Sequence, residues 1–325
     1  MTWAYRSPGW LPGGNLQTIY AAKLATAQSL PDAAWQRERW PTPDGDFVDV
    51  DWVNRDLTGP RPLLVLFHGL EGSSSSHYSQ SFAAQAKQRG WRMALPHFRG
   101  CSGEINLAPR AYHSGDFQEI DWMLQQCQQL HQGPLLAAGI SLGGNALLRW
   151  AGEAGHAAHH MIQGAASVCA PLDLTASGQA MGQGFNRWVY TRMFLQTMKP
   201  RALEKLVQYP SLFDRDALLA AHTLYAFDNV FTAPLHGFKD TDDYWLRASA
   251  KPVLADIRVP ALVLNARNDP FVPAWCLPRA NEVSNCVTLW QPQTGGHVGF
   301  PAGPFPAHVD AMPCAVLDWL QTTLP

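Results

Sequence analysis

The sequence predicts an α/β fold with a mostly parallel, doubly wound sheet. Three observations predict it. Short, almost continuously apolar runs recur along the chain, as expected of strands covered on both faces. Helical patterns alternate with these runs, as in folds whose parallel strands are joined by helices. The length of 325 residues, with 46% hydrophobic and 15% charged residues, suits one large domain with a substantial core.

The expected strands and helices follow one another in a regular order. The first strand, Phe47–Trp52, alternates apolar and polar residues as a half-buried strand does. The later strands are nearly continuous in apolar character: Leu63–Phe67, Arg92–Pro96, Leu135–Gly139, Gly164–Ala170, Ala261–Asn265 and Val287–Trp290. Amphipathic patterns predict helices between and after them: Gln80–Arg89, Asp116–Leu130, Asn145–Gly155 and Ala311–Thr323.

This alternation stops between residues 171 and 260. The segment lacks a clear buried strand, contains helix formers at 201–207 and 216–226, and carries many aromatic residues. A loop of this length without structure of its own would be unusual. We therefore expect a mostly helical cap at residues 171–260, inserted between two late strands of a core made of residues 1–170 and 261–325.

Charge and composition exclude several classes of protein. A net charge of −2 gives no electrostatic reason to bind nucleic acid or an anionic surface. The first residues lack the pattern of a signal peptide, and no apolar run approaches the roughly 18 residues of a transmembrane helix. The six cysteines form no C-x-x-C pair, which favours reduced thiols over disulfides or a metal site. We expect a soluble cytoplasmic protein without metal or cofactor.

Ser141 is the candidate nucleophile. It directly follows the expected strand Leu135–Gly139 and precedes a helical pattern, within the sequence Gly-Ile-Ser-Leu-Gly at 139–143. A G-x-S-x-G segment between a strand and a helix is typical of a nucleophile elbow, in which glycines permit a tight turn that exposes the serine hydroxyl.

Asp269 and His297 are the candidate acid and base. A serine hydroxyl attacks a carbonyl efficiently only when a base removes its proton and an acid orients that base. On such sheets the three residues follow the chain order serine, acid, histidine. Asp269 comes a few residues after the expected strand Ala261–Asn265, and His297 follows Val287–Trp290 in a glycine-containing loop.

The alternative acids and bases are less well placed. Asp173 also follows a strand and stays open as the acid, whereas Asp256 precedes its strand and Asp228 falls inside the expected cap. His308 lies at the start of the last helix, where the helix dipole disfavours the imidazolium that a general base becomes.

Two main-chain N–H groups are expected to stabilise the negative charge on an attacked carbonyl. One belongs to Leu142, the residue after the nucleophile, and the other to Leu70, in the loop after the strand Leu63–Phe67. His68 in the same loop is expected to be structural. In the segment RGCSGE, we expect Arg99 and Glu104 to hold their loop by ion pairs, and no base is evident that would make Cys101 a nucleophile.

The chain resembles the YheT-like branch of the α/β-hydrolases over nearly its whole length. The resemblance rests on WLPGGNLQTIY, HGLEGSSSSHY, FRGCSGE, AYHSGDFQEI, GISLGGN, FDNVFTAPLHGF, NDPF and GGHVGF. It implies a serine hydrolase acting on carboxylic esters, and some animal relatives act on phospholipid acyl chains. It also implies Ser141, Asp269 and His297 as the catalytic residues. The family usually has histidine where this chain has Asn15, so the role of the N-terminal segment stays open.

These observations predict the cleavage of a small-molecule carboxylic ester through an acyl-enzyme. The aromatic residues of the expected cap favour an apolar, lipid-like acyl or alkyl group. Two alternatives stay open: a peptidase or amidase with the same three residues, and a non-catalytic binding protein on a hydrolase scaffold.

Overall fold

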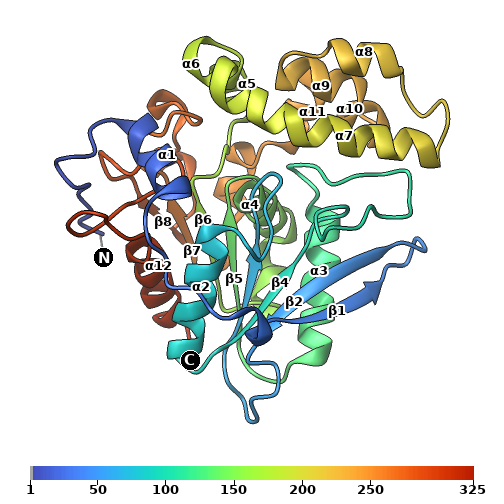
Figure 1. Cartoon of the computed structure of the whole chain (residues 1–325). Coiled ribbons are helices and arrows are strands. Elements are labelled where there is room, and N and C mark those ends of the chain that lie inside the picture. The colour runs from blue at the N-terminus through green and yellow to red at the C-terminus, as the bar shows by residue number, and fades with distance from the viewer. Residues whose placement is uncertain (1–2) are drawn as a thin grey trace.

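The computed structural model describes residues 3–325 and contains an eight-stranded sheet (Figure 1). Its strands are β1 (Gln36–Pro41), β2 (Phe47–Val53), β3 (Leu63–Phe67), β4 (Arg92–Pro96), β5 (Leu135–Ile140), β6 (Gly164–Val168), β7 (Ala261–Leu264) and β8 (Val287–Trp290). The strand order is β1-β2-β4-β3-β5-β6-β7-β8. The β1–β2 and β2–β4 pairs are antiparallel and all other pairs are parallel, which confirms the predicted class.

Helices cover both faces of the sheet. Those outside the β6–β7 connection are α1 (Gly14–Lys23), α2 (His77–Gln88), α3 (Phe117–Leu130), α4 (Leu142–Ala154) and α12 (Ala311–Gln321). Alternate residues of β3 enter two different apolar cores: Leu63 and Val65 pack with α3 and α4, and Leu64 and Leu66 pack with α2 and α12. Because successive side chains of a strand point to opposite faces, this pattern places the two helix layers on opposite sides of the sheet.

The antiparallel edge differs from the sequence prediction. Strand β1 was not expected, and β2, expected to be half-buried, is buried along its whole length. The polar residues of β2 are buried because arginines of β1 cover them. Arg37 lies opposite Asp51 and Arg39 opposite Asp49, each pair joined by a 2.7 Å ion pair.

All the regular secondary structure in the connection between β6 and β7 is helical. It contains α5 (Leu174–Met181), α6 (Gly184–Asn186), a π-helical turn (Arg187–Thr191), α7 (Arg192–Gln208), α8 (Arg215–Ala220), α9 (Leu224–Val230), α10 (Thr232–Leu235) and α11 (Thr241–Ala248). These helices gather above the end of the sheet where α4 begins (Figure 1). The helix formers at 216–226 belong to two helices, because Thr223 begins α9 by accepting a hydrogen bond from the Ala226 N–H (3.1 Å).

The structure also shows the state of the cysteines and the character of the helices. All six cysteines carry free thiols. Across residues 3–325, none of the helices combines the length and the apolar character needed to span a bilayer.

Candidate active site

Ser141 occupies a sharp turn between β5 and α4. Its φ of 52° and ψ of −116° lie outside the regions that residues with a side chain normally adopt. Main-chain hydrogen bonds hold this conformation: the Ser141 N–H donates to the Val168 carbonyl (2.8 Å), and the Asn145 N–H donates to the Ser141 carbonyl (3.1 Å). Strain of this kind persists only where the surrounding structure imposes it, and it often marks a functional residue.

Glycines allow the turn because neighbouring main chains approach too closely for a side chain. A Cβ on Gly143 would lie 2.5 Å from the carbonyl oxygens of Phe67 and His68. A Cβ on Gly139 would lie 2.4 Å from the Gly143 carbonyl oxygen. The first turn of α4 therefore packs directly against the end of β3, and α4 begins at Leu142 rather than at the expected Asn145.

Hydrogen bonds join Ser141, His297 and Asp269. The His297 Nε2 lies 3.0 Å from the Ser141 Oγ, and the His297 Nδ1 lies 2.9 Å from the Asp269 Oδ2. An ionised carboxylate only accepts, so the Nδ1 carries the proton and the Nε2 is left to accept from the serine hydroxyl. This arrangement poises the imidazole to remove the Ser141 proton.

The main chain after Asp269 fixes its carboxylate. The Asp269 Oδ1 accepts hydrogen bonds from the N–H groups of Phe271 (2.8 Å) and Val272 (3.3 Å), and its side chain is fully buried. The Phe271 ring also stacks on the His297 imidazole, with 4.1 Å between ring centroids. The loop after β7 therefore orients the imidazole through both a carboxylate and an aromatic face.

Residues near the N-terminus hold the loop that carries His297, and the sequence analysis missed this role. The Thr18 Oγ1 accepts a hydrogen bond from the His297 N–H (2.8 Å). The Gln17 Oε1 accepts from the Gly295 N–H and from the Asn268 side chain, each at 2.9 Å. The one available signal was the resemblance of WLPGGNLQTIY to the family motif, which gave no contacts.

Asn15, the position that departs from the family pattern, contacts the β6–β7 connection. Its Oδ1 accepts a hydrogen bond from the Tyr190 hydroxyl (2.9 Å). The Tyr190 ring in turn packs edge-on against Phe271, with 4.6 Å between centroids. Helix α1 therefore links the connection to the loops that carry Asp269 and His297.

The N–H groups of Leu70 and Leu142 are available to a ligand. Neither donates a hydrogen bond to any described residue, and both residues line the cavity that contains Ser141. Leu142 is the first residue of α4, where an N–H has no partner within the helix. The pair can therefore stabilise an oxyanion formed on a carbonyl attacked by Ser141.

His68 supports this loop without facing the cavity. Its Nε2 accepts from the Phe98 N–H (3.0 Å), and its Nδ1 lies 2.7 Å from the Gly69 carbonyl oxygen. Burial, reinforced by the neighbouring His97, lowers the pKa of His68 to about 3, so the ring is neutral. These contacts are those of a structural residue.

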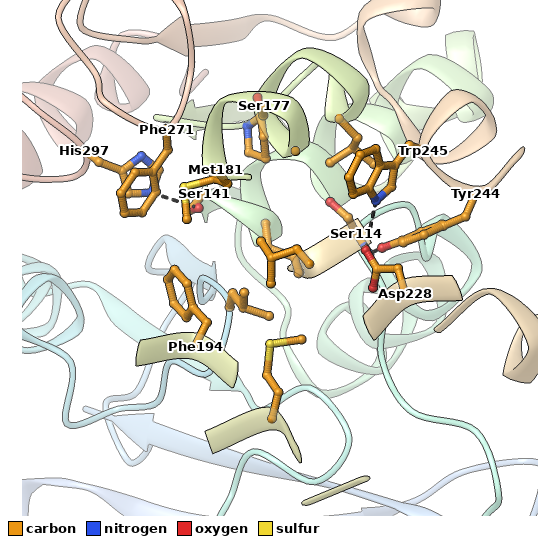
Figure 2. Close-up of a pocket in the computed structure, with 17 residues that line it drawn as sticks. Ser114, Ser141, Ser177, Met181, Phe194, Asp228, Tyr244, Trp245, Phe271 and His297 are labelled. Atoms are coloured by element: carbon orange, nitrogen blue, oxygen red, sulfur yellow. Dashed lines mark hydrogen bonds between the residues drawn. The ribbon is translucent and has the colours of Figure 1, made fainter. Parts of the chain in front are cut away.

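A cavity opens beside Ser141 (Figure 2). Its walls are mostly apolar and come from both the core and the β6–β7 connection: Leu70, Ser114, Ser141, Leu142, Pro171, Leu174, Ser177, Gly178, Met181, Phe194, Met198, Leu224, Asp228, Tyr244, Trp245, Phe271 and His297. We refer to it as the reaction cavity. A second cavity adjoins it and shares Leu70, Leu142, Met198, Asp228 and Tyr244 with it.

The alternative acids and bases make other contacts. The Asp173 carboxylate begins α5 by accepting from the Ala176 N–H (2.9 Å), and Asp256 ends a turn that precedes β7. The His308 Nδ1 accepts from the Asp310 N–H (3.3 Å). Asp228 lines the reaction cavity but bonds to Thr232 and Trp245.

The RGCSGE segment is held by ion pairs to other elements. Arg99 pairs with Asp46 (2.8 Å) and Glu119 (2.5 Å), rather than with residues of its own loop. Glu104 pairs with Arg39 of β1 (2.6 Å). Burial, together with the nearby Glu71 carboxylate, raises the pKa of Cys101 to about 12, which keeps it a neutral thiol and a poor nucleophile.

Cys169, Asp269 and His297 form the one cluster of metal-binding residue types among the described residues. Their donor atoms lie within 4.8 Å of one another. Binding through sulfur requires a thiolate, but burial raises the pKa of Cys169 well above its usual value. The Cys169 sulfur instead accepts a hydrogen bond from the Val298 N–H (3.2 Å), so it fits a neutral thiol that supports the histidine loop.

Comparisons with known proteins show which family the chain belongs to. A family model described as the alpha/beta hydrolase fold matches residues 62–304. The chain is 37% identical over 314 residues to the Escherichia coli protein YheT, an esterase candidate, and the match covers 95% of this chain and 91% of that protein. It is 28% identical to human Phospholipase ABHD3, covering 94% and 76% of the two chains. An esterase of Pyrococcus furiosus has the same fold, with a TM-score of 0.54 at 15% identity over 92% of this chain and 98% of that one.

Proposed function

Because the chain belongs to the α/β hydrolase fold family, we propose that it cleaves carboxylic esters with Ser141 as nucleophile, His297 as base and Asp269 as acid. The observation that carries this proposal is the continuous hydrogen-bonded path from the strained Ser141 through His297 to the buried Asp269. The esterase and phospholipase among the relatives support an ester as the substrate.

In the first half-reaction, His297 Nε2 takes the Ser141 proton while Oγ bonds to the ester carbonyl carbon. The oxygen of the tetrahedral intermediate accepts hydrogen bonds from the Leu70 and Leu142 N–H groups. The carbon–oxygen bond to the alcohol then breaks, and the alcohol takes the proton from His297. Asp269 keeps the imidazole oriented and stabilises its charged form throughout.

In the second half-reaction, water attacks the acyl-enzyme. His297 takes a proton from the water as its oxygen bonds to the acyl carbon, and then gives that proton to Ser141 Oγ as the acyl–serine bond breaks. The products are the carboxylic acid and the regenerated serine. The Leu70 and Leu142 N–H groups serve both halves, because the oxyanion forms at the same place in each.

The mostly apolar walls of the cavity favour a substrate with an apolar, lipid-like acyl or alkyl group. Leu174, Met181, Phe194 and Met198 are contributed by the β6–β7 connection, so this segment sets much of the cavity's shape. We assign residues 171–260 as a cap over a hydrolase core of residues 1–170 and 261–325.

A fluorophosphonate probe tests the nucleophile, because it reacts only with an activated serine. The wild-type chain should be labelled, Ser141→Ala should not, and Ser75→Ala, an exposed serine outside the cavity, should be labelled like the wild type. Ser141→Ala should also lower kcat by roughly 10⁴–10⁶-fold. An unlabelled wild-type chain would instead support a binding protein on a hydrolase scaffold.

A substrate panel tests the bond that is cleaved. p-Nitrophenyl esters should give a higher kcat/KM than aminoacyl p-nitroanilides with similar apolar groups. A preference for the anilides would favour a peptidase or amidase with the same three residues.

A further inference from the structure

A carboxyl group faces the reaction cavity at the end opposite the reacting atoms. Figure 2 shows Asp228 beside Tyr244 and Trp245, with Ser141 and His297 at the other end. Asp228 lines both the reaction cavity and the second cavity, and the residue as a whole is half-buried. A charged group in a mostly apolar cavity costs free energy unless it is paired, so its presence needs an explanation.

Other residues of the protein fill only part of the hydrogen-bonding capacity of this carboxyl group. Asp228 Oδ1 accepts a hydrogen bond from the Thr232 hydroxyl (2.6 Å), and Oδ2 accepts one from the Trp245 Nε1 (2.9 Å). A carboxylate offers about four acceptor positions, so two remain. The two bonds tie α9 to α10 and α11, but this structural role does not require the side chain to line a cavity.

Tyr244 supplies a hydrogen-bond donor at the same place. Its hydroxyl oxygen accepts from the Ser114 N–H (2.9 Å), and no described residue accepts its proton. Tyr244 lines the same two cavities as Asp228. Burial raises the pKa of Tyr244 well above its usual value, so the phenol stays protonated, and burial raises the pKa of Asp228 to about 6.

The position of His297 shows which part of an ester reaches this end of the cavity. The leaving oxygen must lie within hydrogen-bonding distance of the His297 Nε2 to receive its proton. The alcohol would therefore lie toward His297 and Phe271, and the acyl chain would extend from Ser141 in the other direction, toward Asp228.

We propose that Asp228 and Tyr244 form a subsite for a hydroxyl group on the acyl chain, so that the preferred substrates are esters of hydroxylated fatty acids. This inference rests on the proposed function. A hydroxyl group both donates and accepts, which matches the Asp228 acceptor and the Tyr244 donor together. An ammonium group would leave the Tyr244 proton unpaired, and a carboxylate would be repelled by Asp228.

The test compares p-nitrophenyl octanoate with a series of its derivatives in which one hydroxyl group moves a carbon at a time along the chain. At the position that reaches the subsite, the wild-type enzyme should show a kcat/KM about tenfold above that for octanoate, as expected for a hydrogen bond to a charged group. The readout is the ratio of the two kcat/KM values, which cancels differences in the amount of folded enzyme.

Variants connect this ratio to the two residues. Tyr244→Phe removes the donor, together with the acceptor of the Ser114 N–H, and should lower the ratio about threefold. Asp228→Asn replaces a charged acceptor by a weaker neutral one and should also lower the ratio. The double variant should show a ratio near one. Tyr225→Phe, a control in the same connection whose hydroxyl bonds to Asp242 outside both cavities, should keep the wild-type ratio.

The outcomes separate this inference from the proposed function. If the wild-type enzyme cleaves p-nitrophenyl octanoate but a hydroxyl group raises kcat/KM at none of the positions, the subsite is refuted while the proposed function stands. A gain that persists unchanged in the double variant also refutes the subsite. If Ser141→Ala cleaves these esters as well as the wild type does, the proposed function fails, and this inference fails with it.

Discussion

Thr18→Val tests whether the N-terminal segment positions His297, the proposed base. The substitution keeps the shape of the side chain but removes the Oγ1 that accepts from the His297 N–H (2.8 Å) and donates to the Gly14 carbonyl (2.8 Å). Thr18 is only 7% exposed, so water cannot readily replace the lost acceptor. Leaving a buried N–H without a partner costs about 1.5 kcal/mol.

This cost should appear mainly in the chemical step. The His297 N–H belongs to the residue whose imidazole must reach both Ser141 and Asp269, and about 1.4 kcal/mol corresponds to a tenfold change in rate. Thr18→Val should therefore lower kcat roughly tenfold and slow fluorophosphonate labelling similarly, with little change in KM.

A matched control separates positioning from general stability. Thr26→Val removes a hydrogen bond to the Ala307 carbonyl (3.0 Å) in the same N-terminal region, without contacting the histidine loop. Because Thr26 is exposed, water can replace the lost partner, so the free energy of unfolding of this variant in urea should fall by less, while kcat stays near the wild-type value. If Thr18→Val keeps kcat within twofold of the wild type, the segment is a structural support only.

Three further predictions rest on other contacts in the protein. Gly143→Ala should lower the free energy of unfolding by about 3 kcal/mol, measured in urea, because its Cβ would lie 2.5 Å from main-chain oxygens; Gly9→Ala, where the added carbon meets nothing within 4 Å, is the control. Lys205→Met should cost about 2 kcal/mol in the same assay, because the buried Lys205 ammonium donates to the main-chain carbonyls of Asn106 and Ala108, and the Asn106 carbonyl would lose this partner. For Asp228, burial raises the pKa from 3.8 to about 6, so in this window the folded chain holds a proton that the unfolded chain has released. Its contribution to stability should fall as pH rises through the window, and urea titrations at successive pH values should show the wild type losing stability relative to Asp228→Asn; a constant difference would contradict this.

The sequence predicted the features that depend on local pattern. The buried strands were identified because both faces are covered, which makes their apolar runs continuous. Ser141 was singled out because an elbow needs small residues at fixed positions around the serine. The structure brings Ser141, His297 and Asp269 into hydrogen-bonding contact, and their catalytic roles await the tests above.

Features that depend on contacts distant in the sequence were missed. The sequence of strand β1 is mostly charged or polar, which is not typical of a buried strand. The strand forms because its arginines pair with Asp49 and Asp51 of the neighbouring strand β2. The contact between Thr18 and His297 joins residues 279 positions apart, which no local pattern reveals. The break between α8 and α9 depends on a single Thr223 cap within a segment of otherwise good helix formers.

Because of helix α1, the β6–β7 connection cannot be exchanged between relatives independently of the rest of the chain. Asn15 on this helix contacts Tyr190 in the β6–β7 connection, and Thr18, one turn away, holds the histidine loop. A chimera that receives the connection from a relative would place a foreign surface against Asn15. Exchanging residues 14–18 together with the connection should give more active chimeras than exchanging the connection alone. Such a result would indicate that the residue at position 15 and the β6–β7 connection change together among relatives.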